Sequence, residues 1–429
     1  MNIFWFRRDL RLNDNCGLYE ALIADKEVLP IFIFDQEILN KLPKDDARIS
    51  YIHQELENIN KQLNEIGSSL TVCIGKPKEV FSALSKKHEI DTVFCNHDYE
   101  PYAIQRDQEI KELLSSKNIG FKSYKDQVIF ERNEITKKDG TPYKVYTPYS
   151  KKWLEAFEIN GIHCFPSEDN LTKCVKKDSY QLPTLAEIGF KKSPIKVASY
   201  KVTSKLIDTY EETRNFPAKN STSKVGTHLR FGTVSVRKMV EKAAKSNNIT
   251  FLKELIWREF FMQILWHFPQ TTEHSFKPKY DRILWRNNEN DFEAWCKGKT
   301  GYPLVDAGMR ELNQTGFMHN RVRMLVGSFL CKHLLIDWRW GEAYFAEKLH
   351  DYEQSSNIGN WQWVAGCGVD AAPYFRIFNP TTQIQKFDKE LNYIQKWVPE
   401  FQELTYDSPI VEHKFARERC LKTYKEALQ

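Results

Sequence analysis

The feature that most constrains the fold is a change in hydrophobic periodicity part-way along the chain. Near the amino terminus, short β-rich runs alternate with helical segments such as 47–66 and 104–114; the runs cover residues 3–6, 28–34, 70–74 and 92–95. Beyond about residue 196 the period is helical almost throughout, and apolar side chains from Trp257 to Phe268 recur at the spacing of one helix face. This order predicts an α/β domain with a parallel sheet, followed by a helical domain.

The length favours two domains, because 429 residues exceed the size at which a single core stops growing. We place the α/β domain at residues 1–126 and the helical domain at 196–429. The intervening residues 127–195 lose the strand pattern and are rich in lysine, which is typical of a connector on the surface. No G-x-G-x-x-G follows the first strand, and Gly75-Lys76-Pro77 is not a phosphate loop, so the usual dinucleotide fingerprint is absent.

Composition and charge exclude several classes of protein. The nine cysteines are scattered without a C-x-x-C pair, which argues against a metal centre and predicts buried free thiols. No stretch approaches the roughly 18 apolar residues of a membrane span, so we expect a cytoplasmic protein. A net charge of +5 permits a polyanionic partner without requiring one.

Residues 357–380 combine tryptophans, amides and an arginine between glycines. Glycine lets the backbone approach a ligand closely, while Trp361 and Trp363 offer large, flat, easily oxidised rings. This composition suits a planar aromatic ligand, and a buried aromatic loop is an equal alternative. Trp285, Trp338 and Trp361 fall in separate expected helices, where they either relay single electrons to a cofactor or simply fill core volume.

Residues 318–327 predict a helix with one polar face inside an apolar surrounding. That face carries Asn320, Arg323, Met324 and Gly327. A buried Arg323 requires an anionic partner, for which Asp351 and Glu353 are the candidates; a surface ion pair is the alternative. The sequence therefore indicates a lined cavity at this helix.

A second polar group precedes a helix that we expect to contain Arg237. The group consists of Tyr210, Arg214 and Thr222-Ser223-Lys224. Free N–H groups and the dipole at a helix start favour phosphate. Threonine and serine at that place also serve as plain helix caps, which is the simpler interpretation.

Several long motifs, in the same order, resemble those of the photolyase/cryptochrome flavoproteins, most closely the class I cyclobutane pyrimidine dimer (CPD) DNA photolyases. The motifs are Phe4-Trp-Phe-Arg7-Arg8-Asp9-Leu-Arg11-Leu, Glu254-Leu-Ile-Trp257-Arg258-Glu259-Phe260, Gly298-Lys-Thr-Gly301-Tyr-Pro303, and Asn357 to Pro380. The resemblance spans essentially the whole chain. It implies a nucleotide-binding-like antenna domain with a five-stranded parallel sheet, and a helical domain that holds FAD in a U-shaped conformation. We expect a monomer.

The resemblance also implies how FAD is held and used. The expected flavin contacts are Tyr210, Thr222, Ser223, Lys224, Val225, Gly226, Phe251, Glu254, Arg258, Asn320, Arg323, Asp351, Glu353 and Asn357. Arg323 would pair with Asp351 beside the ring, and Asn357 would face flavin N5. Light-excited FADH⁻ would pass an electron to a CPD in UV-damaged DNA, split the dimer and recover the electron. Trp361, Trp338 and Trp285 would carry electrons from the surface to oxidised flavin.

The same resemblance implies a lesion-binding set. Its members are Glu254, Trp257, Asn320, Met324 and Trp363. Trp257 and Trp363 would stack against the dimer, and Glu254, in a desolvated pocket, would hydrogen-bond the thymine and support the reaction. The phosphates that flank the lesion would be bound by Arg214, Arg321 and Arg376.

The chain departs from the family pattern in three segments. Val225-Gly226 replaces a Leu-Ser pair, Glu353 stands where aspartate is common, and Glu100-Pro-Tyr102-Ala103 replaces the Asn-Glu pair that binds a folate antenna. We therefore doubt a folate antenna, and the second chromophore is a deazaflavin, another flavin or none.

Rival functions make different demands on the same positions. The (6-4) photolyases place two histidines where this chain has Asn320 and Met324, which favours cyclobutane dimers. A cryptochrome, the signalling alternative without repair, would have Asp or Cys in place of Asn357 and a long tail beyond Gln429. A flavin oxidoreductase would need a nicotinamide fingerprint, and none is visible.

Overall fold

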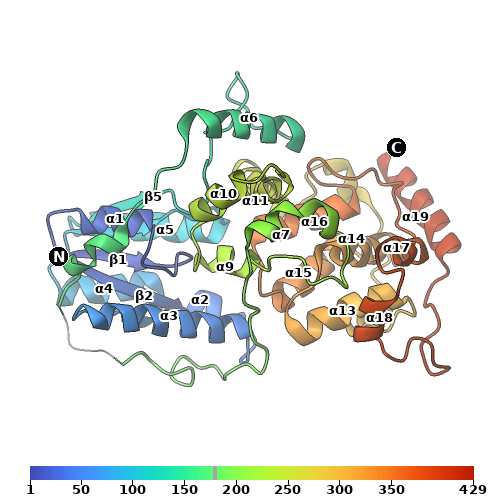
Figure 1. The fold of residues 1–429 in the computed structure, drawn as a ribbon, viewed down its shortest axis with the longest axis horizontal. Coiled ribbons are helices and arrows are strands. Elements are labelled where there is room, and N and C mark those ends of the chain that lie inside the picture. Colours follow the sequence, from blue (N-terminus) through green and yellow to red (C-terminus); the bar gives the residue numbers. More distant parts are fainter. Residues whose placement is uncertain (177–180) are drawn as a thin grey trace. The chain divides into compact units, whose positions relative to one another are not determined.

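The computed structural model describes residues 1–176 and 181–429, which form two compact units (Figure 1). We call them the α/β unit, built from Met1–Glu134, Leu154–Ser199 and Val225–Lys245, and the helical unit, built from Ile135–Trp153, Tyr200–Lys224 and Ser246–Gln429. Each unit thus combines distant stretches of sequence. The connector expected at 127–195 is shared between the units, and its residues 177–180 lie outside the described part of the chain.

A five-stranded parallel sheet forms the centre of the α/β unit, in the order β3-β2-β1-β4-β5. Its strands are β1 (Asn2–Phe6), β2 (Val28–Asp35), β3 (Thr71–Gly75), β4 (Thr92–Asn96) and β5 (Gly120–Tyr124). The first four occupy the runs that the periodicity predicts. The fifth is an edge strand in which Lys122 and Ser123 interrupt the apolar pattern, so its signal in the sequence is weak. The predicted fold class is confirmed.

Helices cover both faces of this sheet, which is why β1 is apolar at nearly every position. Phe4 and Phe6 belong to the cluster that includes side chains of α1 (Cys16–Leu22) and α3 (Ala47–Glu65). Ile3 and Trp5 belong to the cluster on the other face, with α4 (Pro77–Lys87) and α5 (Pro101–Ser115). The unit also contains α2 (Gln36–Leu39), the 3-10 helix η1 (Ser167–Lys173), α9 (Gly226–Phe231) and α10 (Val236–Ala244).

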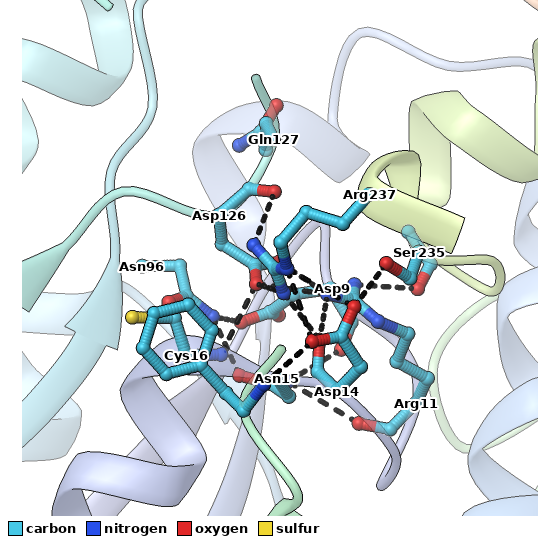
Figure 2. A network of polar contacts seen from close by, with 12 residues as sticks. Asp9, Arg11, Asp14, Asn15, Cys16, Asn96, Asp126, Gln127, Ser235 and Arg237 are labelled. Carbon is cyan, nitrogen blue, oxygen red and sulfur yellow. Dashed lines mark hydrogen bonds and ion pairs between the residues drawn. The ribbon is translucent and has the colours of Figure 1, made fainter. Parts of the chain in front are cut away.

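A buried polar network lies at the carboxyl ends of the strands (Figure 2). Asp9, which follows β1, accepts a 2.6 Å hydrogen bond from the Nδ2 of Asn96 at the end of β4. Asn96 also donates to Asn15 Oδ1 at 2.8 Å, and Asn15 caps α1. The strand order reverses between β1 and β4, and open sheets of this type usually bind nucleotides at such a point. In this unit, hydrogen bonds from Asn96 to Asp9 and Asn15 cross the point between β1 and β4.

Two arginines complete the network. Arg11 donates to both oxygens of Asp126, at 2.8 and 2.7 Å, and Arg237 on α10 donates to Asp126 at 2.8 Å and to Asp14 at 3.0 Å (Figure 2). Burial alone would raise the pKa of Asp126, but the charges of Arg11 and Arg237 lower it to about 2. The carboxylate is therefore ionised at neutral pH. Through these bonds Arg237 holds α10 against the rest of the α/β unit.

The helical unit is built around one large apolar cluster that includes Trp295, Phe329, Trp338 and Trp361. Its elements are α7 (Ser204–Asp208), α8 (Tyr210–Thr213), α11 (Thr250–His267), η2 (Pro269–Thr272), η3 (Pro278–Arg282), α12 (Glu289–Lys297), α13 (Pro303–Thr315), α14 (Asn320–Ser328), the π-helix η4 (Phe329–His333), α15 (Trp338–Lys348), α16 (Gln354–Ala365), α17 (Pro380–Phe387), α18 (Asn392–Trp397) and α19 (His413–Leu428). The helix α6 (Tyr146–Asn160) begins in this unit and ends in the other.

The helix α11 departs from the expected single apolar face. Phe260, Phe261, Ile264 and Leu265 are buried as predicted, but Glu259 and Gln263 are buried as well. The helix is therefore enclosed on most sides. In the described residues, 1–176 and 181–429, no helix has both the length and the apolar composition that crossing a membrane requires.

Candidate flavin and DNA site

The glycine-flanked aromatic segment changes from buried to exposed along its length. Trp361 on α16 is 3% exposed, and a Cβ at Gly341 would collide with its ring, so that glycine is needed for the close approach. Trp363 is half-buried, and the loop after Gly366 exposes 62% of Phe375 and leaves Arg376 exposed. A wholly buried aromatic loop is therefore the wrong interpretation, because the loop ends in exposed apolar and charged side chains.

Asn357 on α16 is held from one side only. Its Nδ2 donates to the backbone oxygen of Glu342 at 3.2 Å and to Glu342 Oε1 at 3.0 Å. Its own Oδ1 accepts no hydrogen bond from the described residues. Burial raises the pKa of Glu342, while hydrogen bonds from Asn357 and Tyr352 lower it. The sequence analysis missed Glu342 because no motif spacing connects it to Asn357, which lies a helix further along the chain.

Arg323 makes the ion pair that the sequence predicts. Its two terminal nitrogens lie 3.1 and 2.9 Å from the oxygens of Asp351, and its Nε donates to the backbone oxygen of Met318 at 2.7 Å. The pair is largely buried, with side-chain exposures of 24% and 19%. Glu353, the other candidate, instead caps α16 by accepting from the N–H groups of Ser355 and Ser356.

Phe317 links this pair to the expected phosphate side. The guanidinium of Arg323 lies 5.7 Å from the centre of the Phe317 ring, and the Nζ of Lys224 lies 5.6 Å from the same centre. Cations near a ring face are attracted by its quadrupole. One aromatic ring that the sequence analysis missed therefore brings Lys224 and Arg323 to a common place in the helical unit.

Three arginines surround a buried histidine at the start of α14. His319 is 3% exposed, and its Nδ1 caps the helix by accepting from the N–H of Arg321 at 3.2 Å. Burial, followed by the charges of Arg323, Arg321 and Arg214, lowers the pKa of His319 to about 4. The imidazole is therefore neutral at pH 7, and its Nε2 has no hydrogen-bond partner in the described residues. The region concentrates positive charge, which suits a phosphate-rich ligand.

Arg214, expected to bind DNA phosphate, and Glu254, expected to contact the flavin and the lesion, lie next to each other. Arg214 forms an ion pair with Glu254, and its guanidinium lies 5.5 Å from the centre of the Tyr210 ring. Tyr210 in turn meets Phe251 edge-on at 5.2 Å. The Glu254 side chain is 33% exposed, so it is less desolvated than the resemblance suggests.

The other two arginines expected to bind phosphate differ in the exposure and contacts of their side chains. Arg321 donates to Asn215 Oδ1 at 2.5 Å and lies over the Phe387 ring at 4.3 Å. Arg376 is exposed, and its backbone oxygen accepts a 2.7 Å hydrogen bond from the Nζ of Lys332. Arg376 is thus more exposed than Arg214 and Arg321, which are half-buried. The contact of Lys332 with its backbone was not predicted from the sequence.

The group around Thr222 does not lead into one helix as expected. The helix α9 ends at Gly232, whose φ of 63° is left-handed, and Arg237 lies on the separate helix α10. A Cβ at Gly232 would collide with the backbone of Arg8, so the turn requires glycine. Val225, the N-cap residue of α9, makes no side-chain capping hydrogen bond.

The remaining candidates lie where their helices place them. Trp257 and Arg258 are half-buried on α11, Asn320 is the exposed first residue of α14, and Met324 is half-buried one turn later. Val225 is buried and Gly226 exposed at the start of α9.

The three tryptophans that the resemblance assigns to an electron relay belong to one apolar cluster, but they do not all lie on helices. Trp338 begins α15, Trp361 lies on α16, and both are inside the cluster, with Trp285 packed against it. Trp285 is in the coil between η3 and α12, which corrects the expectation of a helix there. Asn287, with a φ of 46°, and the capping Asn288 interrupt any helix through this point.

The donor and acceptor set of the helical unit fits a flavin. A flavin ring edge presents carbonyl oxygens, a ring N–H and N5, and the chain offers the Arg323–Asp351 pair and the unengaged oxygen of Asn357. Lys224 and the arginines around His319 supply cations for a diphosphate. No group of three His, Cys, Asp or Glu side chains in residues 1–176 and 181–429 is arranged to hold a metal ion.

The residues that replace the folate-binding pair are engaged within the α/β unit. Glu100 forms ion pairs with Arg8 and Arg230, each at 3.1 Å, and Tyr102 donates to Asp35 at 2.6 Å. A cleft of about 830 Å³ lies elsewhere in this unit, between α3 and residues 184–199.

Comparison with known proteins identifies the family. Residues 2–169 match the family model described as DNA photolyase, and residues 251–405 match the FAD binding domain of DNA photolyase. The deoxyribodipyrimidine photo-lyase of Agrobacterium fabrum is 36% identical and is aligned over 98% of this chain and 97% of its own length.

Solved structures give the same result. A class III photolyase from Agrobacterium tumefaciens superposes with a TM-score of 0.88 at 34% identity, covering 99% of this chain and 97% of its own. An archaeal photolyase from Sulfolobus tokodaii with two FAD molecules gives 0.85 at 34% identity, covering 99% and 100%. A cryptochrome from Synechocystis gives 0.84 at 25% identity, covering 99% of both chains. The chain therefore belongs to the DNA photolyase family of FAD-binding lyases, as its motifs predict.

Proposed function

We propose that this protein uses light and reduced FAD to split cyclobutane pyrimidine dimers in UV-damaged DNA. The observation that carries the proposal is the convergence in one unit of the Arg323–Asp351 pair, the one-sided Asn357 and the half-buried Trp257. The near-full-length similarity to a deoxyribodipyrimidine photo-lyase supports the same reaction.

Reduced FAD, when bound and excited, supplies the electron that breaks the cyclobutane ring. The chain's own residues would hold the edge of the ring. Arg323, which is paired with Asp351, would donate to the flavin carbonyl side, and Asn357, whose amide nitrogen donates to Glu342, would face N5 with its side-chain oxygen. Toward the phosphates we assign Lys224, the hydroxyls of Thr222 and Ser223, the backbone at Val225 and Gly226, and Arg258. Tyr210, Phe251, Asn320 and Glu353 complete the proposed flavin set.

The lesion would meet a wall of apolar side chains and a carboxylate. We propose that Trp257, Met324 and Trp363 contact the dimer, because its saturated ring has lost base planarity and prefers apolar surface. Glu254 and Asn320 would hydrogen-bond the thymine edges. Oε1 of Glu254 is paired with Arg214, so a DNA phosphate that binds Arg214 would release this oxygen for the thymine. Arg321 and Arg376 would bind the flanking phosphates.

Three further assignments complete the proposal. Trp361, Trp338 and Trp285 would carry electrons from the surface to oxidised flavin. We keep the expectations of a class I enzyme, a monomer and a cytoplasmic location, and of domains at 1–126 and 196–429 with a connector between them. A second chromophore, if one is bound, would be a flavin or deazaflavin before a folate, because Glu100 and Tyr102 already have partners in the α/β unit.

The second candidate is a light-signalling flavoprotein without repair. The similarity to a cryptochrome structure favours it, and so does the occupied state of Glu254. An amide at position 357 argues against it, because a carboxylic acid or thiol would supply a proton there more readily than an amide does.

Substrate choice tests the proposal directly. The purified, reduced protein would be illuminated with matched oligonucleotides that carry either a CPD or a (6-4) lesion, and each lesion would be counted by chromatography. We expect light-dependent loss of the CPD alone. Repair of neither lesion would leave the signalling candidate, whereas repair of the (6-4) lesion would show that Asn320 and Met324 were wrongly interpreted.

A further inference from the structure

The ring of Trp257 has a stacking partner that no motif identifies. Tyr146, at the start of α6, lies face to face with Trp257, with ring centres 3.6 Å apart and planes inclined by 7°. Tyr146 is buried, with 8% exposure. One face of the tryptophan is therefore covered by the chain itself.

This arrangement is not the one that two free rings adopt. Aromatic pairs prefer offset or edge-to-face contacts over a parallel sandwich, since their negative faces repel each other. Other contacts must therefore hold the two rings in register. The structure shows these contacts at both ends of the tyrosine.

Tyr146 is fixed through its hydroxyl and its backbone. The hydroxyl donates to the backbone oxygen of Lys253 at 2.7 Å, on the same helix as Trp257. The N–H of Tyr146 donates to Asp370 Oδ2 at 3.1 Å. Asp370 has a left-handed φ of 46° and lies in the loop that carries Arg376.

The remaining neighbours of Trp257 are aromatic as well. Phe260 meets both Trp257 and Tyr146 edge-on, with ring centres 5.6 and 5.9 Å away. Phe261 lies 5.5 Å from Trp257 with its plane inclined by 30°, and it is packed so tightly on α16 that a Cβ at Gly359 would collide with it. Trp257 is thus packed against three aromatic rings in the absence of any ligand.

We propose that Tyr146 is a positioning residue for lesion recognition: it fixes the plane of Trp257 and so contributes to the preference for dimer-containing over intact DNA. The inference rests on the proposed function. A tryptophan fixed in advance loses no rotamer freedom when the dimer binds, whereas a mobile one loses an amount equivalent to about tenfold in affinity. Intact DNA held by phosphate contacts does not use this wall, so only lesion binding benefits.

Binding in the dark, where no turnover occurs, tests this role. Dissociation constants would be measured for a CPD-containing duplex and the same duplex undamaged, using wild type, Tyr146→Phe and Tyr146→Leu. Tyr146→Leu should weaken binding of the damaged duplex about tenfold and leave the undamaged duplex within about twofold. Tyr146→Phe keeps the ring and should stay close to wild type. Equal weakening for both duplexes overturns the proposal.

A double-mutant cycle separates positioning from general damage to the fold. In a Trp257→Ala background, Tyr146→Leu should cost little further affinity, because its effect acts through the tryptophan. Fully additive losses would contradict that. If Tyr146→Leu does not bind FAD or does not fold, Asp370→Ala is measured in its place. This variant should reduce the preference for damaged DNA about threefold. An unchanged preference overturns the proposal. A wild type without any preference would refute the proposed function itself.

Discussion

The buried amine of Lys332 should make the free energy of unfolding depend on pH. Its side chain is 1% exposed, and its hydrogen bond in the described part of the chain goes to the backbone oxygen of Arg376. Burial lowers the pKa of this amine from its ordinary 10.5 to about 8, an effect that the thiols of Cys420 and Cys331 partly oppose. At neutral pH the amine is therefore mostly protonated and holds the loop that carries Arg376 through this hydrogen bond. Keeping a charge buried lowers the stability of the folded protein.

The sign of the pH dependence follows from the two pKa values. Between pH 8 and 10.5 the unfolded chain keeps the proton on Lys332 and the folded chain releases it, so the free energy of unfolding rises with pH. From pH 7 to pH 9 the contribution of this one group amounts to about 1.3 kcal/mol. The variant Lys332→Met has no amine and lacks this rise.

Urea unfolding at pH 7, 8 and 9 measures the effect as a difference between wild type and Lys332→Met. Buried groups that do not interact with Lys332 titrate alike in both proteins, so their contributions cancel in the difference. The exposed Lys297→Met variant serves as the control and should follow wild type throughout. If Lys332→Met shows the same pH slope as wild type, the buried amine does not titrate in this range and the reasoning is refuted.

Three other substitutions test individual contacts. Gly341→Ala should destabilise the protein by about 1–3 kcal/mol, because the added methyl group collides with Trp361; unchanged thermal unfolding would contradict the packing. Arg323→Lys should retain FAD about 10- to 100-fold more weakly, since lysine cannot make both hydrogen bonds to Asp351, while Arg310→Lys at the pair with Glu400 should not; equal FAD content after dialysis in all three proteins would remove Arg323 from the flavin site. Trp361→Phe should slow photoreduction of oxidised flavin under an external donor, measured by flash absorption, with the half-buried Trp397→Phe as control; a rate equal to wild type would refute the relay.

Much of the fold could be predicted because local patterns and burial agree. The strand runs at 3–6 and 28–34 are apolar on successive residues, as expected of a parallel sheet that is covered on both faces. The partner of Arg323 was predictable for a similar reason, since a buried guanidinium needs an anion and few acids lie nearby in the sequence. Spacing alone left Asp351 and Glu353 open, the family resemblance pointed to Asp351, and the structure pairs Arg323 with Asp351 and uses Glu353 as a helix cap.

Other parts of the site depend on contacts that sequence spacing does not encode. Tyr146 meets Trp257 across more than a hundred residues, and Lys332 reaches a backbone oxygen whose position no side-chain pattern reveals. The prediction of a helix at Trp285 was wrong because it ignored two turn-forming residues that follow. Asn287 has a left-handed φ, and Asn288 caps α12. The pairing of Arg214 with Glu254 was missed because each residue was assigned to a different ligand.

The most direct test of the central claim is the number of dimers repaired per flavin. The reduced protein would be illuminated under anaerobic conditions, without added reductant, in the presence of a large excess of CPD-containing oligonucleotide. Because the electron returns after each cleavage, we expect many dimers to be split per bound FAD while the visible spectrum of the reduced flavin is unchanged at the end. Repair that stops at one dimer per flavin, or no repair in light compared with the dark control, would contradict the account.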